Sequence, residues 1–206
     1  MSSKNQELQN SHPYLIGKQP IEWLFRYREN NTLYVWILFG TVGLILLYKS
    51  IFIENIAWYL ILFLIPTGAL TWTFFEYILH RFALHYIKEN EWVKRWHHFV
   101  HGKHHTIPRD LTFVTASPIV TILPALSFFV VFYLILGSHL VWPFFAGFGF
   151  GYMLYEYTHH AIHKYPRPPK IVKPLWENHL IHHYKHPDKR FGVTNTIWDR
   201  VFGTYK

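Results

Sequence analysis

Residues 96–105 read WHHFVHGKHH and hold five of the sixteen histidines of this 206-residue chain. Within this stretch, His101, His104 and His105 follow the spacing i, i+3 and i+4, which places three side chains on one face of a helix. Imidazole is the commonest metal ligand among side chains, and three imidazoles that converge in so apolar a chain need a shared partner. The stretch therefore predicts a metal site.

The histidine pattern is repeated along the chain. The sequence HLIHH (179–183) copies the spacing of the first triple, and a spaced histidine pair precedes each triple, in HRFALH (80–85) and HHAIH (159–163). Each pair ends sixteen residues before its triple begins, a register that chance enrichment would not keep. The predicted metal ligands are His80, His85, His101, His104, His105, His159, His163, His179, His182 and His183.

Ten imidazoles exceed what one ion binds. Two metal ions with about five ligands each would leave a position open for water or oxygen. Imidazole suits iron, zinc, copper or nickel, and thiolate ligands are excluded because the chain has no cysteine. His80 and His85 are five residues apart, about 140° around a regular helix, so we predict that the helix ends or distorts near Phe82–Leu84.

Three carboxylates lie near the histidines. Glu76 precedes His80 by four residues, Glu156 precedes His159 by three, and Asp199 stands in WDRVFGT. We interpret them as acceptors that orient an imidazole through its second N–H group, not as ligands. The alternatives are a glutamate that simply reaches water at the membrane edge and, for Asp199, a helix or turn cap.

Four apolar runs, at 33–48, 56–79, 113–136 and 140–157, alternate with polar segments. We predict an all-α integral membrane protein with four transmembrane helices in two hairpins and a cytoplasmic helical cap that holds the histidine-rich dimetal site. Four spans put the histidines and both termini on one face. Of the twenty lysines and arginines, only Lys49 falls in the connections on the opposite face, so the positive-inside rule makes the histidine face cytoplasmic.

The chain divides into two predicted segments: residues 1–32 form a polar N-terminal segment at the membrane interface, and residues 33–206 form the membrane domain. The formal charge of +8 is spread among aromatic, proline and histidine residues, without a basic recognition helix. This distribution favours anionic lipid over nucleic acid as the partner.

Over about residues 71–205 the chain resembles the fatty acid hydroxylase/sterol desaturase superfamily of membrane dimetal oxygenases. The resemblance rests on HRFALH (80–85), HFVHGKHH (98–105), the Pro108-x-Asp110 motif, YEYTHHAIH (155–163), HLIHH (179–183) and FGVTNTIWDRVFGT (191–204). The five-residue step from His80 to His85 and the glycine in HGKHH are more similar to the fatty acid 2-hydroxylase branch than to sterol desaturases.

The resemblance implies two iron ions, replaceable by zinc in purified protein, that use O2 to hydroxylate C2 of a fatty acyl chain, free or in a sphingolipid or ceramide. No catalytic residue beyond the metal ligands is implied. The chain shows no flavin or dinucleotide motif and no room for a cytochrome b5 domain. We therefore expect a separate electron donor such as cytochrome b5 or ferredoxin with its reductase. A multi-pass location in the ER membrane or a bacterial inner membrane is expected, with the active site and both termini cytoplasmic.

The lipid is expected to enter from the bilayer, through a slot lined by Trp72, Tyr152 and Tyr155; the alternative for these residues is an interfacial aromatic belt. Three other functions compete with this one. The same chemistry would serve a sterol or carotenoid, by hydroxylation or desaturation. A metal transporter would place its sites near the bilayer midplane. A membrane haem protein would need histidine pairs that face each other across helices.

Overall fold

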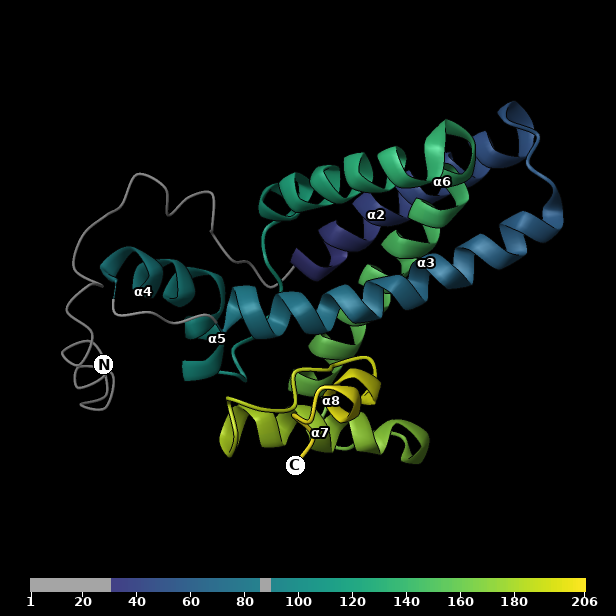
Figure 1. Cartoon of the computed structure of the whole chain (residues 1–206). Coiled ribbons are helices and arrows are strands. Elements are labelled where there is room, and N and C mark those ends of the chain that lie inside the picture. Colours follow the sequence, from purple (N-terminus) through teal and green to yellow (C-terminus); the bar gives the residue numbers. More distant parts are fainter. Residues whose placement is uncertain (1–30, 86–89) are drawn as a thin grey trace.

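The computed structural model describes residues 31–85 and 90–206, and within these ranges the regular structure is helical, without strands (Figure 1). The proposed N-terminal segment lies almost entirely outside the described residues. In chain order the elements are α2 (Asn31–Tyr48), η2 (Lys49–Ile53), α3 (Trp58–Leu79), η3 (His80–Leu84), α4 (Glu91–His97), η4 (His98–Gly102), α5 (Lys103–Thr106), η5 (Leu111–Phe113), α6 (Pro118–Lys164), η6 (Lys170–Val172), α7 (Lys173–Tyr184) and α8 (Ile197–Val201). Of the short segments, η2, η3 and η4 are π-helical, and η5 and η6 are 3₁₀ turns.

Three of the described helical segments are long and apolar enough to cross a membrane: Asn31–Ile53, Trp58–Leu84 and Val120–Lys164. Large apolar side chains on them point outward, as Leu62 and Leu134 do, at 64% and 77% exposure. A water-soluble surface rarely carries so continuous an apolar cover. The predicted third and fourth helices fall together in the long element α6.

Helix α6 nevertheless turns back on itself at Gly137, where φ is 75° and ψ is 173° (Figure 1). Such a conformation is open to glycine because it has no Cβ. The rings of Phe128 and Phe148 are 5.2 Å apart, and those of Phe132 and Phe144 are 4.8 Å apart. In a straight helix, residues twenty positions apart would be separated by about 30 Å. The two parts of α6 therefore form an antiparallel pair, with its tight connection at the predicted place.

Contacts at the two ends of the bundle fix the direction of the helices. Thr32 Oγ1, at the start of α2, lies 3.1 Å from Nδ1 of His160, which puts this end of α2 beside the histidine-rich end of α6. Glu54 Oε2 lies 3.6 Å from Nδ1 of His139. The connection after α2 and the turn at Gly137 therefore meet at the other end, away from the histidines.

Helices α3 and α6 touch through their backbones at two glycines. A Cβ atom on Gly68 would overlap the carbonyl oxygen of Phe144, and a Cβ atom on Gly147 would overlap the carbonyl oxygen of Ile65. Small residues allow such close approach between apolar helices. The approach holds the ends of α3 and α6, which carry both histidine pairs, at a fixed separation.

Replacing Gly68 with alanine is therefore expected to lower the free energy of unfolding by about 1–3 kcal/mol, the usual cost of overpacking. Thermal unfolding of the purified protein in detergent would measure the change. Gly40→Ala is the matched control, because its added methyl group meets only Met153 Cε, at 3.5 Å. Equal unfolding temperatures for the two variants would contradict the packing account.

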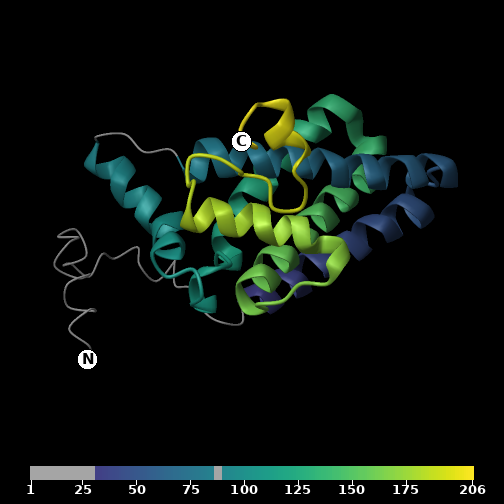
Figure 2. The same ribbon diagram turned by 90° about the horizontal axis from the view of Figure 1, so that it is seen from below.

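The shorter helices gather at the histidine-rich ends of α3 and α6. Trp198 Nε1, on α8, donates a hydrogen bond to Thr73 Oγ1 on α3 (3.0 Å), and the rings of Tyr77 and Phe202 stack at 5.2 Å. In Figure 2, α7 runs alongside α3, and the C-terminal segment passes over α3. The chain after α6 thus returns to α3 and brings the second histidine triple to the first pair.

Candidate metal centre

The first histidine pair depends on a π-helical turn. The backbone N–H of His85 donates to the carbonyl oxygen of His80 at 3.1 Å, which is an i to i+5 hydrogen bond, and η3 spans His80–Leu84. This wider turn reduces the angle between the two side chains, and their rings stand 5.0 Å apart. The predicted distortion near Phe82–Leu84 is confirmed.

The structure brings all ten predicted ligands together in two groups of five, within each of which one nitrogen per residue lies within 4.8 Å of the others. Group one consists of His80, His85, His101, His105 and His182. Group two consists of His104, His159, His163, His179 and His183. Both groups are mostly buried, and either arrangement could hold a metal ion.

The two groups exchange one histidine each. The middle histidine of the first triple, His104, belongs to group two, and the middle histidine of the second triple, His182, belongs to group one. The rings of His105 and His183 stack at 4.2 Å where the groups meet. Neither group forms without both copies of the repeat, so the two candidate sites are one structural unit.

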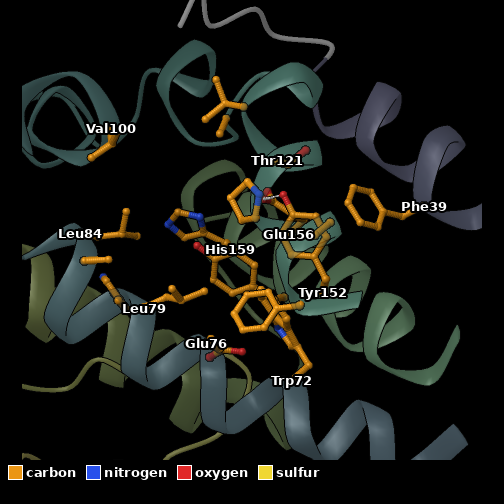
Figure 3. A pocket seen from close by; sticks show the side chains of 18 of the residues that line it. Phe39, Trp72, Glu76, Leu79, Leu84, Val100, Thr121, Tyr152, Glu156 and His159 are labelled. Atoms are coloured by element: carbon orange, nitrogen blue, oxygen red, sulfur yellow. Dashed lines mark hydrogen bonds between the residues drawn. The ribbon is translucent and has the colours of Figure 1, made fainter. Parts of the chain in front are cut away.

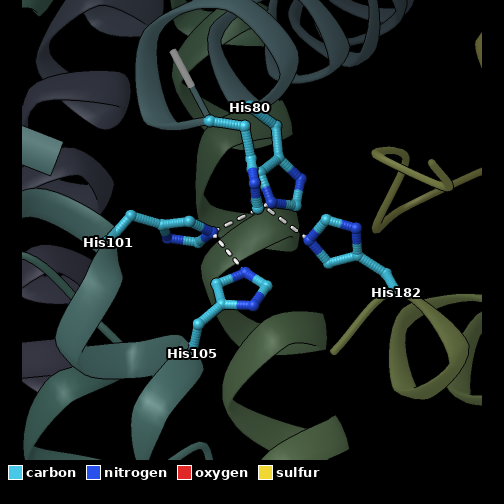
Figure 4. Close-up of side chains that lie close together, drawn as sticks. His80, His101, His105 and His182 are labelled. Atoms are coloured by element: carbon cyan, nitrogen blue, oxygen red, sulfur yellow. Dashed lines mark hydrogen bonds between the residues drawn. The ribbon is translucent and has the colours of Figure 1, made fainter. Parts of the chain in front are cut away.

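The ring nitrogens within each group are too crowded to satisfy one another. His101 Nε2 lies 3.1 Å from His80 Nε2 and 3.0 Å from His105 Nε2 (Figure 4). One imidazole nitrogen carries either a single hydrogen or a single lone pair, so it serves one in-plane partner. In group two, His179 Nε2 likewise has two close neighbours, His163 Nε2 and His183 Nε2, each at 3.0 Å. A cation at the centre would accept all of these lone pairs at once.

The spacing of the nitrogens fits a metal ion with more than four ligands. Six Nε2–Nε2 pairs within the groups are separated by 2.9–3.1 Å. Two imidazole nitrogens bound at about 2.0–2.1 Å stand about 2.9 Å apart at a right angle and about 3.3 Å apart at a tetrahedral angle. The observed separations match the right angle. Five nitrogens at such angles leave one position of an octahedron open.

Hydrogen bonds fix the tautomer of two ligands in group one. His80 Nδ1–H donates to the carbonyl oxygen of Phe191, and His182 Nδ1–H donates to that of Lys189, both at 2.6 Å. In a neutral ring the lone pair is then on Nε2, which faces the group. Burial lowers the pKa of His182 to about 4 and also lowers the pKa of His101 well below its ordinary value. Neutral imidazoles, the form that binds metal, therefore dominate at neutral pH.

The expected role of Glu76 was wrong. Its Oε1 accepts from the backbone N–H groups of Val193 (2.7 Å) and Thr194 (2.9 Å), and its Oε2 accepts from the Thr194 hydroxyl (2.6 Å). Glu76 is one turn before His80 along the helix, but its carboxylate faces the C-terminal segment. It binds a loop and does not touch an imidazole through these hydrogen bonds.

Asp199 acts as a turn cap, the alternative considered for it. Its Oδ1 accepts from the backbone N–H of Phe191 (2.8 Å) and its Oδ2 from that of Gly192 (2.9 Å). Because the Phe191 carbonyl accepts from His80, the hydrogen bonds of Asp199 connect it to this ligand through the backbone of Phe191. Sequence reasoning missed Phe191 and Lys189, since a carbonyl acceptor leaves no side-chain signature.

Glu156 differs from its expected role as well. Its Oε1 accepts from the Tyr152 hydroxyl at 2.8 Å, and its Oε2 is buried without a hydrogen-bond partner among the described residues. His159 Nδ1, the nitrogen that Glu156 was expected to orient, is also buried and unpaired within that part of the chain. The carboxylate instead lines a cavity.

This cavity, of about 630 Å³, lies against both histidine groups. His80 and His101 of group one and His159 of group two form part of its wall. The proposed slot residues Trp72, Tyr152 and Tyr155 line it as well, together with mainly apolar side chains (Figure 3). An apolar cavity with a few polar groups and two candidate metal sites at one wall suits a lipid substrate.

The cavity extends to the outer surface of the protein. Its wall includes the exposed residues Ala83, after the end of α3, and Leu123 and Pro124, near the start of α6. All three belong to helical segments that are apolar enough to cross a membrane.

The remaining histidines of the described residues lie outside both groups. Neither group contains His97, His98, His160 or His186. The ring of His97 stands 6.2 Å from that of His85, and burial lowers the pKa of His97. His139 lies at the opposite end of the bundle, and His12 is outside the described residues.

Fold and site together define a helical protein of membrane type with two adjacent five-histidine groups. A family model described as fatty acid hydroxylase matches residues 65–204, and the chain belongs to the fatty acid hydroxylase family.

Individual relatives agree with this assignment. A dihydroceramide fatty acyl 2-hydroxylase of Arabidopsis thaliana is 35% identical over 141 residues, which are 68% of this chain and 60% of the relative. A ceramide very long chain fatty acid hydroxylase of Saccharomyces cerevisiae is 32% identical over 93% of this chain and 50% of its own length. The human fatty acid 2-hydroxylase is 31% identical over 66% of this chain and 38% of its own length. The chain thus spans at most about three fifths of these relatives.

The fold has a counterpart among solved structures. The structure described as full-length scs7p, with only its hydroxylase domain visible, superposes with a TM-score of 0.81 at 29% sequence identity. The match covers 91% of this chain and 70% of the other. The helical arrangement described above is therefore that of a known hydroxylase domain.

Proposed function

We propose that this chain is a membrane oxygenase that hydroxylates C2 of a lipid acyl chain at a dimetal centre. The observation that carries the proposal is the convergence of ten histidine nitrogens in two groups, three members of which form the wall of an apolar cavity. The three relatives, from a plant, a yeast and human, are named as hydroxylases of dihydroceramide acyl chains, ceramide or fatty acids. Their agreement across organisms supports an acyl substrate.

The ten histidines would hold the two ions, which we propose to be iron in the working enzyme, with zinc able to occupy the same nitrogens. Bound iron would supply the activation of O2, with two electrons from a separate donor such as cytochrome b5 or ferredoxin with its reductase. The chain itself would contribute neutral Nε2 lone pairs, a buried site and a cavity wall that excludes water. The face that carries the histidines also carries the lysines and arginines other than Lys49, and this positive charge would complement an acidic electron carrier.

The acyl chain would lie in the cavity with its carbonyl group near the histidines, because C2 is bonded to the carbonyl carbon. Trp72 Nε1 is buried and has no hydrogen-bond partner among the described residues. It would donate to the acyl carbonyl oxygen. The rings of Trp72 and Tyr155 are 5.9 Å apart, and those of Tyr155 and His159 are 5.6 Å apart, so this donor is connected to group two by direct packing. The acyl group would be free or part of a sphingolipid or ceramide.

We further propose that residues 33–206 form the membrane domain and cross the bilayer four times, twice through α6. Thr32 beside His160 and Glu54 beside His139 support alternate crossing directions. The short helices around the histidines would form a cytoplasmic cap, because Lys49 is the single lysine or arginine in the opposite connections. The host membrane would be the ER membrane or a bacterial inner membrane, with residues 1–32 at the cytoplasmic interface.

Expression in a host that lacks 2-hydroxylated lipids tests the proposed reaction. Mass spectrometry of the extracted lipids is expected to show a hydroxyl group at C2 of acyl chains, in cells that express the protein and not in cells with an empty vector. A hydroxyl group at another carbon, a new double bond, or unchanged lipids from metal-loaded protein would reject the proposal.

A further inference from the structure

The two histidine groups are equivalent in sequence but not in their hydrogen bonds. The repeat pairs His80 with His159 and His182 with His104. In group one, Nδ1 of His80 and of His182 donates to a backbone carbonyl oxygen at 2.6 Å. Their counterparts in group two, His159 and His104, are buried, and their Nδ1 atoms have no hydrogen-bond partner in the described part of the chain.

Two more ligands of group two share this property. The Nδ1 atoms of His179 and His183 are also buried without a hydrogen-bond partner among the described residues. When Nε2 binds a metal ion, Nδ1 of a neutral ring must carry the hydrogen. A buried N–H group without an acceptor is unfavourable, because it has lost its hydrogen bonds to water without replacement. Binding of an ion by group two therefore fixes several rings in a tautomer that its surroundings do not stabilise.

Group one is supported by a segment that we call the strap, residues 189–194. Its carbonyl groups at Lys189 and Phe191 accept from the two ligands. Two buried carboxylates hold the strap in place: Asp199 accepts from the N–H groups of residues 191 and 192, and Glu76 accepts from those of residues 193 and 194. A Cβ atom on Gly192 would overlap the carbonyl oxygen of Asn195, so the strap also requires glycine at this position.

Acceptors behind a ligating histidine orient its ring and raise its basicity, and their loss typically lowers metal affinity about 10- to 100-fold. Group one has such acceptors at His80 and His182, whereas their counterparts His159 and His104 have none among the described residues. In group two a backbone hydrogen bond to Pro108 supports His163. We propose that the two groups hold their ions with unequal affinity, group one more tightly, and that Asp199 and Glu76 are the positioning residues that produce the difference through the strap. This inference rests on the proposed dimetal function.

Stepwise removal of Zn²⁺ from the purified full chain tests the inference. The protein is loaded with Zn²⁺, equilibrated with increasing chelator, and analysed for zinc per chain. Two release steps are expected, with midpoints at least about tenfold apart in chelator concentration. Anomalous diffraction from crystals of the half-depleted protein is expected to place the remaining ion among His80, His101 and His182.

Variants identify the cause. Asp199→Asn is expected to move the tighter step about tenfold or more toward the weaker one and to leave the weaker step in place. If the Asp199 variant does not fold, Glu76→Gln provides a second, independent test, because it weakens the hydrogen bonds from the N–H groups of Val193 and Thr194. Glu177→Gln is the control, because among the described residues this exposed carboxylate on α7 forms an ion pair with Lys173, at 3.2 Å. This variant is expected to leave both steps unchanged.

The possible results separate this inference from the proposed function. Release of both ions in one step, a remaining ion in group two, or unchanged release from both strap variants would overturn the inference and leave the dimetal function intact. Failure of the wild-type chain to bind any ion would overturn both.

Discussion

Replacing His104 with alanine is expected to lower the formation of 2-hydroxylated lipid by at least about a hundredfold, since even an outer partner of a metal ligand is worth up to that much. His104 is buried, its Nε2 lies 2.9 Å from that of His159, and it is the residue of the first triple that crosses into group two. The loss of this ligand is expected to remove the ion from group two and to leave the ion of group one alone. Lipid mass spectrometry and metal content, measured on the same preparation, would show both effects.

His139→Ala is the matched control for this variant. His139 lies in the turn at the opposite end of the bundle, is 52% exposed at its side chain, and lies 3.6 Å from Glu54. Its replacement is expected to leave product formation and metal content at the wild-type level. Equal activity of the two variants would show that the histidine groups are not the reaction centre.

Replacing Gly149 with phenylalanine is expected to lower hydroxylation of long acyl chains at least about tenfold, because a pocket discriminates by the apolar volume it admits. Gly149 lines the cavity, and a Cβ atom there would meet only Phe39 Cδ1, at an ordinary 3.8 Å. A ring at this position would therefore extend into the space proposed for the acyl chain. The metal content should not change, since no histidine of either group lies next to the Cβ position of Gly149.

A graded series at the same position separates volume from damage to the fold. Gly149→Ala is expected to retain wild-type activity, and larger side chains should shift the products toward shorter acyl chains before activity is lost. Wild-type rates and chain lengths in the Gly149→Phe variant would show that the cavity is not the substrate site.

The ligand set could be predicted from sequence because its signal is periodic. The spacing of His101, His104 and His105, its copy 78 residues later, and the five-residue step from His80 all constrain side-chain direction on a helix. The same step required a distortion, which the π-helical turn η3 provides. The exchange of His104 and His182 between the groups could not be predicted, because it depends on how two distant helices pack.

The carboxylates show where the sequence stops being informative. Glu76 and Glu156 precede histidines by about one helical turn, which suggested contact with an imidazole. Residues one turn apart share a helix face, but a side chain there can still turn to a different partner. Tertiary packing turned Glu76 toward Val193 and Glu156 toward Tyr152. The acceptors that the imidazoles do have are backbone carbonyl groups. Their positions follow from the strap conformation and not from residue type.

Anomalous diffraction from crystals of iron-loaded protein, measured above and below the iron absorption edge, tests the dimetal centre most directly. Two iron peaks are expected, one surrounded by the Nε2 atoms of group one and one by those of group two. A single peak shared by both groups, or iron bound away from these nitrogens, would contradict it.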